Sequence, residues 1–246
     1  MNREPSGIFD DRADAYKVSG DLLVGIAKAH FDLTIDPLTH GRWREAMAIM
    51  REIDTHADND DIDPEQVLDE LSDYSIYAES YPLLSPTELG KPLHEKVVGR
   101  VDTILAIGAY ASQNTSLDQY IELRVNEAYE TIEILGDLAS SELTENKIFT
   151  QHYLPAIFHL GAAATLWDSI IDGPRDYRHD ELSIKPNPRY YRELSKGVVE
   201  HGRASQGALF HVAPLAAIAR KGVARAINRA RNGMTDYTTL RVLGRR

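Results

Sequence analysis

The chain has 246 residues, of which 43% are hydrophobic and none is cysteine. Its 38 acidic residues outnumber the 27 basic ones and give a formal net charge of -11, so it lacks the overall cationic surface that nucleic-acid binding requires. The absence of cysteine excludes disulfides, thiolate zinc sites and cysteine nucleophiles. A chain of this length can bury one sizeable core, so residues 1–246 are expected to form a single domain, with any disorder in roughly the first 12 residues.

The N-terminal residues, MNREPSGIFDDRADAYK, are charged where a secretory signal peptide requires an apolar stretch. No run that is apolar throughout approaches the ~20 residues of a membrane span. We therefore expect a cytoplasmic protein. The basic segment from Arg220 to Arg231 could touch anionic lipid, although such a helix more often has a solvated face.

Apolar residues recur at intervals of three and four along most of the chain, which is the period of helices rather than strands. The expected helices cover residues 14–33, 37–58, 61–80, 87–113, 117–142 and 146–172, and two more follow between roughly residues 190 and 231. Pro37 suits the first turn of the second helix, and Ser116 can cap the helix that follows it. No alternating strand pattern or internal repeat occurs. The sequence predicts an all-α, single-domain helical bundle with short connections.

Two pairs of aspartates, each four residues apart, stand at the ends of apolar helical segments. Asp54 and Asp58 belong to IDTHAD, and Asp168 and Asp172 belong to LWDSIID, which Asp176 continues. Residues four apart in a helix project from one stripe, turned by about 40° per step. A hard cation such as Mg²⁺, which prefers oxygen ligands, would relieve the repulsion within each pair. For one stripe alone, a solvated acidic face is the alternative.

Two such stripes could face each other across a cavity and share several Mg²⁺ ions with a diphosphate. The carbon–oxygen bond of a prenyl diphosphate could then ionise to an allylic cation in a pocket from which water is excluded. Apolar and aromatic walls would accommodate the prenyl chain and stabilise the cation. Core packing is the alternative role of each wall candidate, and Trp43 and Trp167 are expected to be core residues. The wall candidates are Tyr120, Tyr129, Phe158 and His159.

The order of residues from Tyr153 to Tyr191 carries a family resemblance. Tyr153 and Pro155 lead through an apolar helix to the three aspartates, and Tyr190 and Tyr191 follow. This order resembles the second metal motif of class I isoprenoid synthases, most closely that of bacterial large-terpene synthases related to tetraprenyl-β-curcumene synthase. The segment IDTHADNDDIDPEQV is similar to the first motif, and squalene and phytoene synthases use related pairs. The likeness covers roughly residues 43–191.

The resemblance implies an α-helical isoprenoid-synthase fold that pairs as dimers in many relatives. It also implies a lyase that uses several Mg²⁺ ions to ionise a prenyl diphosphate and form a cyclised or rearranged terpenoid. Head-to-head coupling of the squalene or phytoene type is one alternative, and a non-catalytic protein that binds prenyl diphosphates is another. The implied metal ligands are Asp54, Asp58, Asp168, Asp172 and Asp176.

A diphosphate also needs cationic donors. Arg124 lies on the helix before the second motif, where this superfamily often carries a diphosphate-sensing arginine; a salt bridge with Glu127 or Asp118 is the alternative. The arginines that flank the second motif could clamp phosphate bidentately, or could only neutralise the neighbouring aspartates. The candidates for diphosphate binding are Arg124, Arg175, Arg178 and Lys185.

The chain departs from the family pattern at Gly173-Pro174, directly after Asp172. Proline lacks a backbone donor and collides with the preceding turn, so we expect the helix to break or kink here and Asp176 to leave the stripe. The second motif also lacks the asparagine and serine ligands of many terpene cyclases, and His56 lies inside the first. These departures allow a lost or altered activity.

Overall fold

The computed structural model describes residues 10–57, 81–111, 115–178 and 182–205. Throughout these ranges the regular structure is helical and contains no strand, which confirms the all-α prediction. The helix expected over residues 61–80, the end of the chain beyond residue 205 and its basic segment lie outside the described residues.

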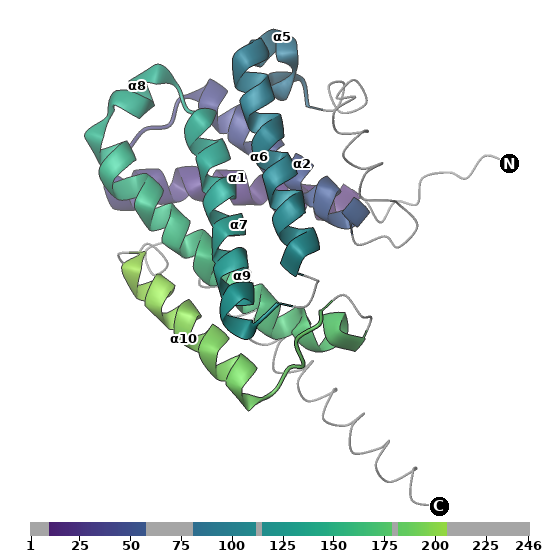
Figure 1. Cartoon of the computed structure of the whole chain (residues 1–246). Coiled ribbons are helices and arrows are strands. Elements are labelled where there is room, and N and C mark those ends of the chain that lie inside the picture. The colour runs from purple at the N-terminus through teal and green to yellow at the C-terminus, as the bar shows by residue number, and fades with distance from the viewer. Residues whose placement is uncertain (1–9, 58–80, 112–114, 179–181, 206–246) are drawn as a thin grey trace, which may run out of the picture.

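Within each described range the helices follow one another with short connections (Figure 1). They are α1 (Asp10–Phe31), α2 (Pro37–Ala57), η1 (Pro82–Leu84), α5 (Pro86–Leu89), α6 (Lys91–Ala111), α7 (Leu117–Asp137), α8 (Ser141–Glu145), the π-helical η2 (Phe149–Tyr153), α9 (Leu154–Arg178) and α10 (Pro188–Ala204).

Polar side chains define where the main helices begin. Ser116 caps α7: its Oγ accepts from the backbone N–H of Gln119 at 3.3 Å, and the Gln119 side chain accepts from the Ser116 N–H at 3.0 Å. Asn187 caps α10 in a similar way, directly before Pro188. The predicted cap at Ser116 is therefore confirmed.

One apolar cluster joins α1, α2, α6, α7 and η2. Trp43 lies fully buried at its centre and donates from Nε1 to the Leu135 carbonyl at 2.8 Å. Its ring stacks on Phe149 and Tyr153, and the Tyr153 hydroxyl donates to the Leu23 carbonyl at 3.0 Å. Trp43 is thus the core residue that its apolar surroundings predict, and it ties α2 to α7 and η2.

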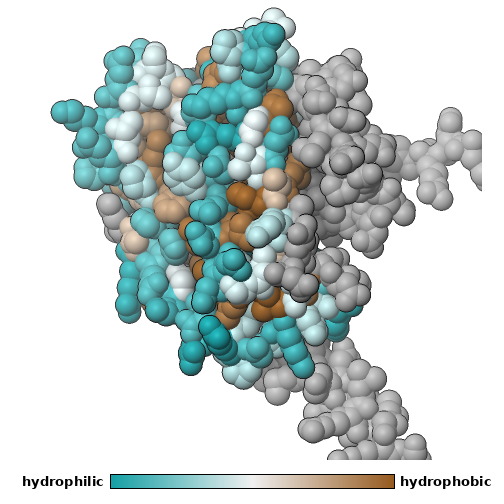
Figure 2. Space-filling view, viewed as in Figure 1, coloured by the Kyte–Doolittle hydropathy of each residue, from teal (hydrophilic) through white to brown (hydrophobic). Residues whose placement is uncertain are grey.

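A second apolar cluster forms where α7, α9 and α10 pack together. Tyr120 of α7, Leu166 of α9 and Leu194 of α10 are buried in it. Figure 2 shows hydrophilic side chains over most of the visible face, with hydrophobic atoms gathered around α6 and α7. The second cluster supports the part of α9 that carries the second aspartate stripe.

The predicted break at Gly173-Pro174 is wrong, because α9 continues to Arg178, whereas a kink there stays a prediction. Proline has a backbone angle that suits a helix, but Pro174 cannot donate to the Ile170 carbonyl and its ring crowds that carbonyl. The neighbouring turn is held from α10, where the buried Tyr190 donates its hydroxyl proton to the Ser169 carbonyl at 2.8 Å. Asp176 therefore remains on the helix.

The continuous helical stretch of residues 149–178 is long and apolar enough to cross a membrane by length and composition. The core helix of a soluble protein meets the same criterion. Here α9 packs against α7 and α10, and 33% of the apolar window is buried. A cytoplasmic location stays a prediction.

Candidate functional site

The first aspartate stripe lies at the edge of the described structure. Asp54 occupies the last two turns of α2, whereas its side chain and all of Asp58 lie outside the described residues. Figure 1 shows the C-terminal ends of α2 and α9 on the same side of the view. The convergence of the two stripes stays a prediction.

The second stripe occupies three successive turns near the end of α9. Asp168 is exposed, whereas Asp172 and Asp176 are half-buried. Arg175 donates from Nε to Asp176 Oδ1 at 3.1 Å, so Arg175 neutralises this aspartate, as one of its two predicted roles requires. Among the described residues, no group of three or more His, Asp or Glu side chains could hold a metal ion. Asp168 and Asp172, which lie one turn apart on α9, are called the acidic pair below. Metal binding by this pair and by Asp176 stays a prediction.

Arg124 crosses from α7 to this stripe. Its Nε donates to Ser169 Oγ at 3.2 Å, and its Nη1 pairs with Glu127 one turn along α7. Asp118 instead lies 3.8 Å from Arg189, so of the two predicted carboxylate partners the salt bridge forms with Glu127. Because Ser169 directly follows Asp168, its bond places the guanidinium beside the turn that carries the acidic pair. The two predicted roles of Arg124 are therefore compatible.

Ser169 is a site residue that the sequence analysis missed. It is 3% exposed, and its Oγ donates to the Thr165 carbonyl at 3.0 Å while accepting from Arg124. Its backbone carbonyl receives the Tyr190 hydroxyl, as described above. The sequence shows only a serine next to an aspartate within an apolar helical run. Such a serine usually points to solvent or bonds to its own helix, so this pattern does not predict a bond to Arg124.

Tyr190 and Tyr120 close the inner side of the stripe. Their ring centroids lie 6.2 Å apart. Burial raises the pKa of Tyr190, and the nearby Tyr120 and Asp176 raise it further, so its phenol stays protonated and acts as a donor at neutral pH. Tyr120 is the wall candidate that the structure brings next to the acidic stripe.

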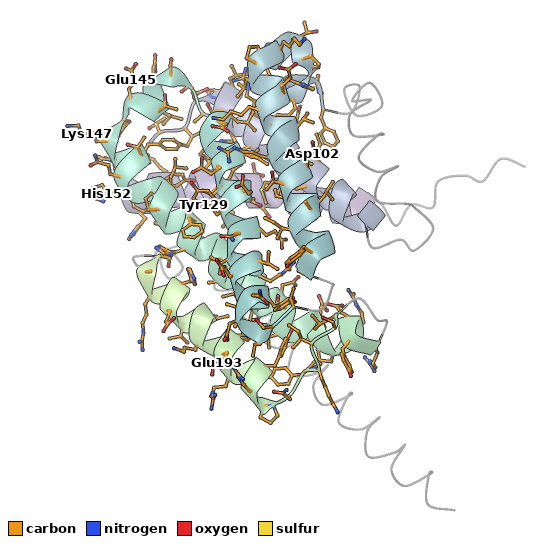
Figure 3. All side chains as sticks on the ribbon, viewed as in Figure 1. Asp102, Tyr129, Glu145, Lys147, His152 and Glu193 are labelled. Atoms are coloured by element: carbon orange, nitrogen blue, oxygen red, sulfur yellow. The ribbon has the colours of Figure 1, made fainter. Side chains whose placement is uncertain are left out.

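The other three wall candidates meet higher on α9, away from the stripe. Tyr129 contacts Phe158 edge to face with centroids 5.7 Å apart, and Figure 3 shows Tyr129 between α7 and α9, distant from the C-terminal end of α9. His159 shares a hydrogen bond with His201 of α10, with 3.0 Å between their Nδ1 atoms. These contacts are those of helix packing, so a role in the cavity wall stays a prediction for all three.

The remaining cationic candidates lie on exposed surface beyond the stripe. Arg178 donates from Nε to the Pro174 carbonyl at 3.0 Å, which caps the end of α9. Lys185 lies in the loop between α9 and α10. Both are close in sequence to the acidic pair, and diphosphate binding by either stays a prediction.

The acidic pair fits Mg²⁺ by its chemistry. Carboxylates on consecutive turns supply two hard oxygen ligands, and Mg²⁺ in phosphate-transferring sites is commonly held by one or two carboxylates together with phosphate and water. No family model, curated protein or solved structure matches this chain.

Proposed function

We propose that this protein is a magnesium-dependent class I isoprenoid synthase that binds a prenyl diphosphate at the C-terminal half of α9 and ionises it. The observation that carries the proposal is the bond from Arg124 to Ser169. It brings a permanent cation from α7 to the α9 turn that carries Asp168 and Asp172. A diphosphate bound through Mg²⁺ requires this combination of oxygen ligands and a cationic donor.

Each group has a role that follows from its chemistry. Asp168 and Asp172 would hold Mg²⁺, which supplies Lewis-acid stabilisation of the negative charge on the diphosphate leaving group. Arg124 would donate hydrogen bonds to the diphosphate oxygens, because guanidinium matches phosphate geometry. The buried phenols of Tyr120 and Tyr190 keep water away from the inner side of the stripe. The aromatic ring of Tyr120 is also suited to a neighbouring carbocation.

The proposed product is a cyclised or rearranged terpenoid. Coupling of two prenyl chains would use the same ionisation step, and a non-catalytic protein would bind the diphosphate without releasing it. Product analysis distinguishes these three outcomes.

The test is diphosphate release from geranyl, farnesyl, geranylgeranyl and longer prenyl diphosphates, with and without Mg²⁺, combined with analysis of an organic extract. We expect release that requires Mg²⁺ and falls by about 100-fold or more in Asp168→Asn, Asp172→Asn and Arg124→Gln. Asp54→Asn tests the first stripe in the same assay.

Two control variants match these changes on exposed surface. Asp32→Asn removes a carboxylate that pairs with Lys28, and Arg192→Gln removes a guanidinium that pairs with Glu193. Both should retain the full rate. Folded wild-type protein that releases no diphosphate from any substrate would overturn the enzymatic proposal, and binding without release would identify a prenyl-diphosphate-binding protein.

A further inference from the structure

Ser169 links two helices through one side chain and one carbonyl. Its Oγ accepts from Arg124 of α7, and its carbonyl accepts from the Tyr190 hydroxyl of α10. All three side chains converge on the α9 turn between Asp168 and Asp172. The structure thus fixes this turn from both sides at the point where the acidic pair projects.

The contact with α10 is closely fitted. A Cβ atom added at Gly173 would overlap the Tyr190 hydroxyl, so only glycine lets this phenol reach the α9 backbone. Tyr190 is fully buried and is placed by the Asn187 cap, whose Oδ1 accepts from the Tyr190 N–H at 3.1 Å. The start of α10 therefore sets the position of the phenol over α9.

The chemistry of Ser169 indicates a purpose beyond helix stability. A serine that donates to the carbonyl four residues earlier stabilises a helix less well than alanine does, and it often bends the helix slightly. The Ser169 Oγ also accepts a hydrogen bond from the Arg124 guanidinium, and alanine could not provide this interaction. That hydrogen bond orients the planar donor group of Arg124 toward the Asp168 turn.

We propose that Ser169 and Tyr190 are positioning residues of the diphosphate site. Ser169 orients Arg124, and Tyr190 holds the α9 turn so that Asp168 and Asp172 keep their spacing relative to that cation. This inference rests on the proposed function, because it specifies how Arg124 and the two aspartates of the same site are kept in position. Neither residue needs to touch the substrate.

The chain offers a matched control for each residue. Ser205 is also a fully buried serine whose Oγ donates to a backbone carbonyl, that of Gly202 at 2.7 Å, but no arginine bonds to it among the described contacts. Tyr153 is also a buried phenol that donates to a backbone carbonyl. Removal of the Ser205 or Tyr153 hydrogen bond therefore measures only the effect of losing such a bond on protein stability.

The experiment measures the dissociation constant of inorganic pyrophosphate in the presence of Mg²⁺ by isothermal titration calorimetry on the full chain. Ser169→Ala and Tyr190→Phe should each weaken binding by roughly tenfold, the scale of one charge-assisted hydrogen bond. Ser205→Ala and Tyr153→Phe should change the dissociation constant by less than about twofold. Their unfolding midpoints should nevertheless fall by about as much as those of Ser169→Ala and Tyr190→Phe. Ser169→Thr, which keeps the hydroxyl, should restore binding.

A double-mutant cycle tests the assignment of Ser169 to Arg124. If Ser169 acts through Arg124, Ser169→Ala should have little further effect in an Arg124→Gln background. Equal losses in the site variants and their matched controls, with wild-type binding intact, would overturn the positioning role and leave the proposed function standing. Wild-type protein that does not bind pyrophosphate with Mg²⁺ would overturn both.

Discussion

At the scale of single residues, Gly173 is decisive because its missing side chain leaves room for the Tyr190 hydroxyl. In most helices alanine in place of glycine stabilises by about 0.5–1 kcal/mol. At position 173 the added methyl group meets a fully buried phenol that cannot retreat without losing its bond to Ser169. We therefore expect Gly173→Ala to lower the free energy of unfolding by about 1–3 kcal/mol, as overpacking does.

Urea denaturation would measure this change. Gly161→Ala is the control, because a Cβ there would lie no closer than 3.7 Å to its neighbours, and it should leave stability unchanged or raise it. Tyr190→Phe removes the overlapping hydroxyl, so the double variant should lose less than the sum of the two single losses. Additive losses would show that the two residues do not interact.

Single-residue signals predicted some features of this structure and missed others. The cap at Ser116 and the core position of Trp43 follow from local rules, and both are confirmed. The role of Ser169 depends on Arg124 from a helix some 45 residues earlier, a pairing that no local pattern encodes. Local rules fail where a residue is placed by another helix.

At the scale of helices, α6 and α7 are joined by an arginine that contacts three carboxylates. Arg100 bonds to Glu130 at 2.7 Å, to Glu133 at 3.0 Å and to Asp137 at 2.8 Å. Arg100→Met would leave these acids side by side on α7, with only Asp137 still paired, to Lys96 at 2.6 Å, among the ion pairs described for them. We therefore expect a loss of about 1–3 kcal/mol of unfolding free energy. The loss should shrink in about 1 M salt, which screens the repulsion that remains.

Chemical denaturation at low and high salt tests this expectation. Lys91→Met removes an exposed partner of Glu95 on α6 and should cost less than about 0.5 kcal/mol. A similar loss in both variants, or a loss at Arg100 that salt does not change, would contradict the role assigned to the three carboxylates.

The contact between α9 and α10 should respond to pH. Burial lowers the pKa of His201, the facing His159 of α9 lowers it further, and Glu200 on its own helix opposes the shift. In the unfolded chain His201 titrates near about pH 6.5, so below that pH the unfolded state binds more protons than the folded state. Stability should therefore be highest above this pH and fall as the pH drops through it. Protonation of both rings would also break the bond between their Nδ1 atoms.

Unfolding free energies measured at intervals between about pH 8 and pH 5 test this expectation, because that window lies above the titration of most carboxylates. His201→Asn keeps a polar group near the Nδ1 position and cannot titrate, so its stability should fall less across the window. His94, whose pKa is also lowered by burial, should leave a residual slope in that variant. An unchanged slope would assign the pH dependence to groups other than His201.

Helix periodicity predicted most of these elements, whereas the proline rule gave the wrong expectation of a break at Gly173-Pro174. A proline inside a helical pattern is a sound reason to expect a break, because the sequence does not reveal what packs against it. In the structure the start of α10 supports this turn of α9 through Tyr190. Tertiary contact of this kind outweighs the local preference.

At the scale of the whole molecule, composition and periodicity predicted the all-α class. They did not predict which helices would neighbour one another. The two apolar clusters share α7 and α9, so these two helices connect the Trp43 core to the turn that carries Asp168 and Asp172. A ligand that binds at that turn should therefore raise the stability of all the described helices together, rather than that of one helix end.

The last prediction uses this connection. A ligand that binds only the folded state stabilises it by about 2.7 kcal/mol at 100 times its dissociation constant. For a domain of this size, Mg²⁺ with pyrophosphate should raise the melting temperature by roughly 5–10 °C, measured by differential scanning calorimetry. Neither component alone should do so fully, because the carboxylates need the cation before they can hold an anion in a chain of net charge -11.

The Asp168→Asn/Asp172→Asn double variant should lose the shift, since its amides cannot replace the two charges that hold Mg²⁺. Asp32→Asn should keep the shift, because this exposed carboxylate pairs with Lys28 at the end of α1. Sodium sulfate at matched ionic strength separates specific binding from screening of the acidic surface, which would stabilise every variant alike. A shift of equal size in the double variant would place the ligand elsewhere and remove the basis for assigning the site to α9.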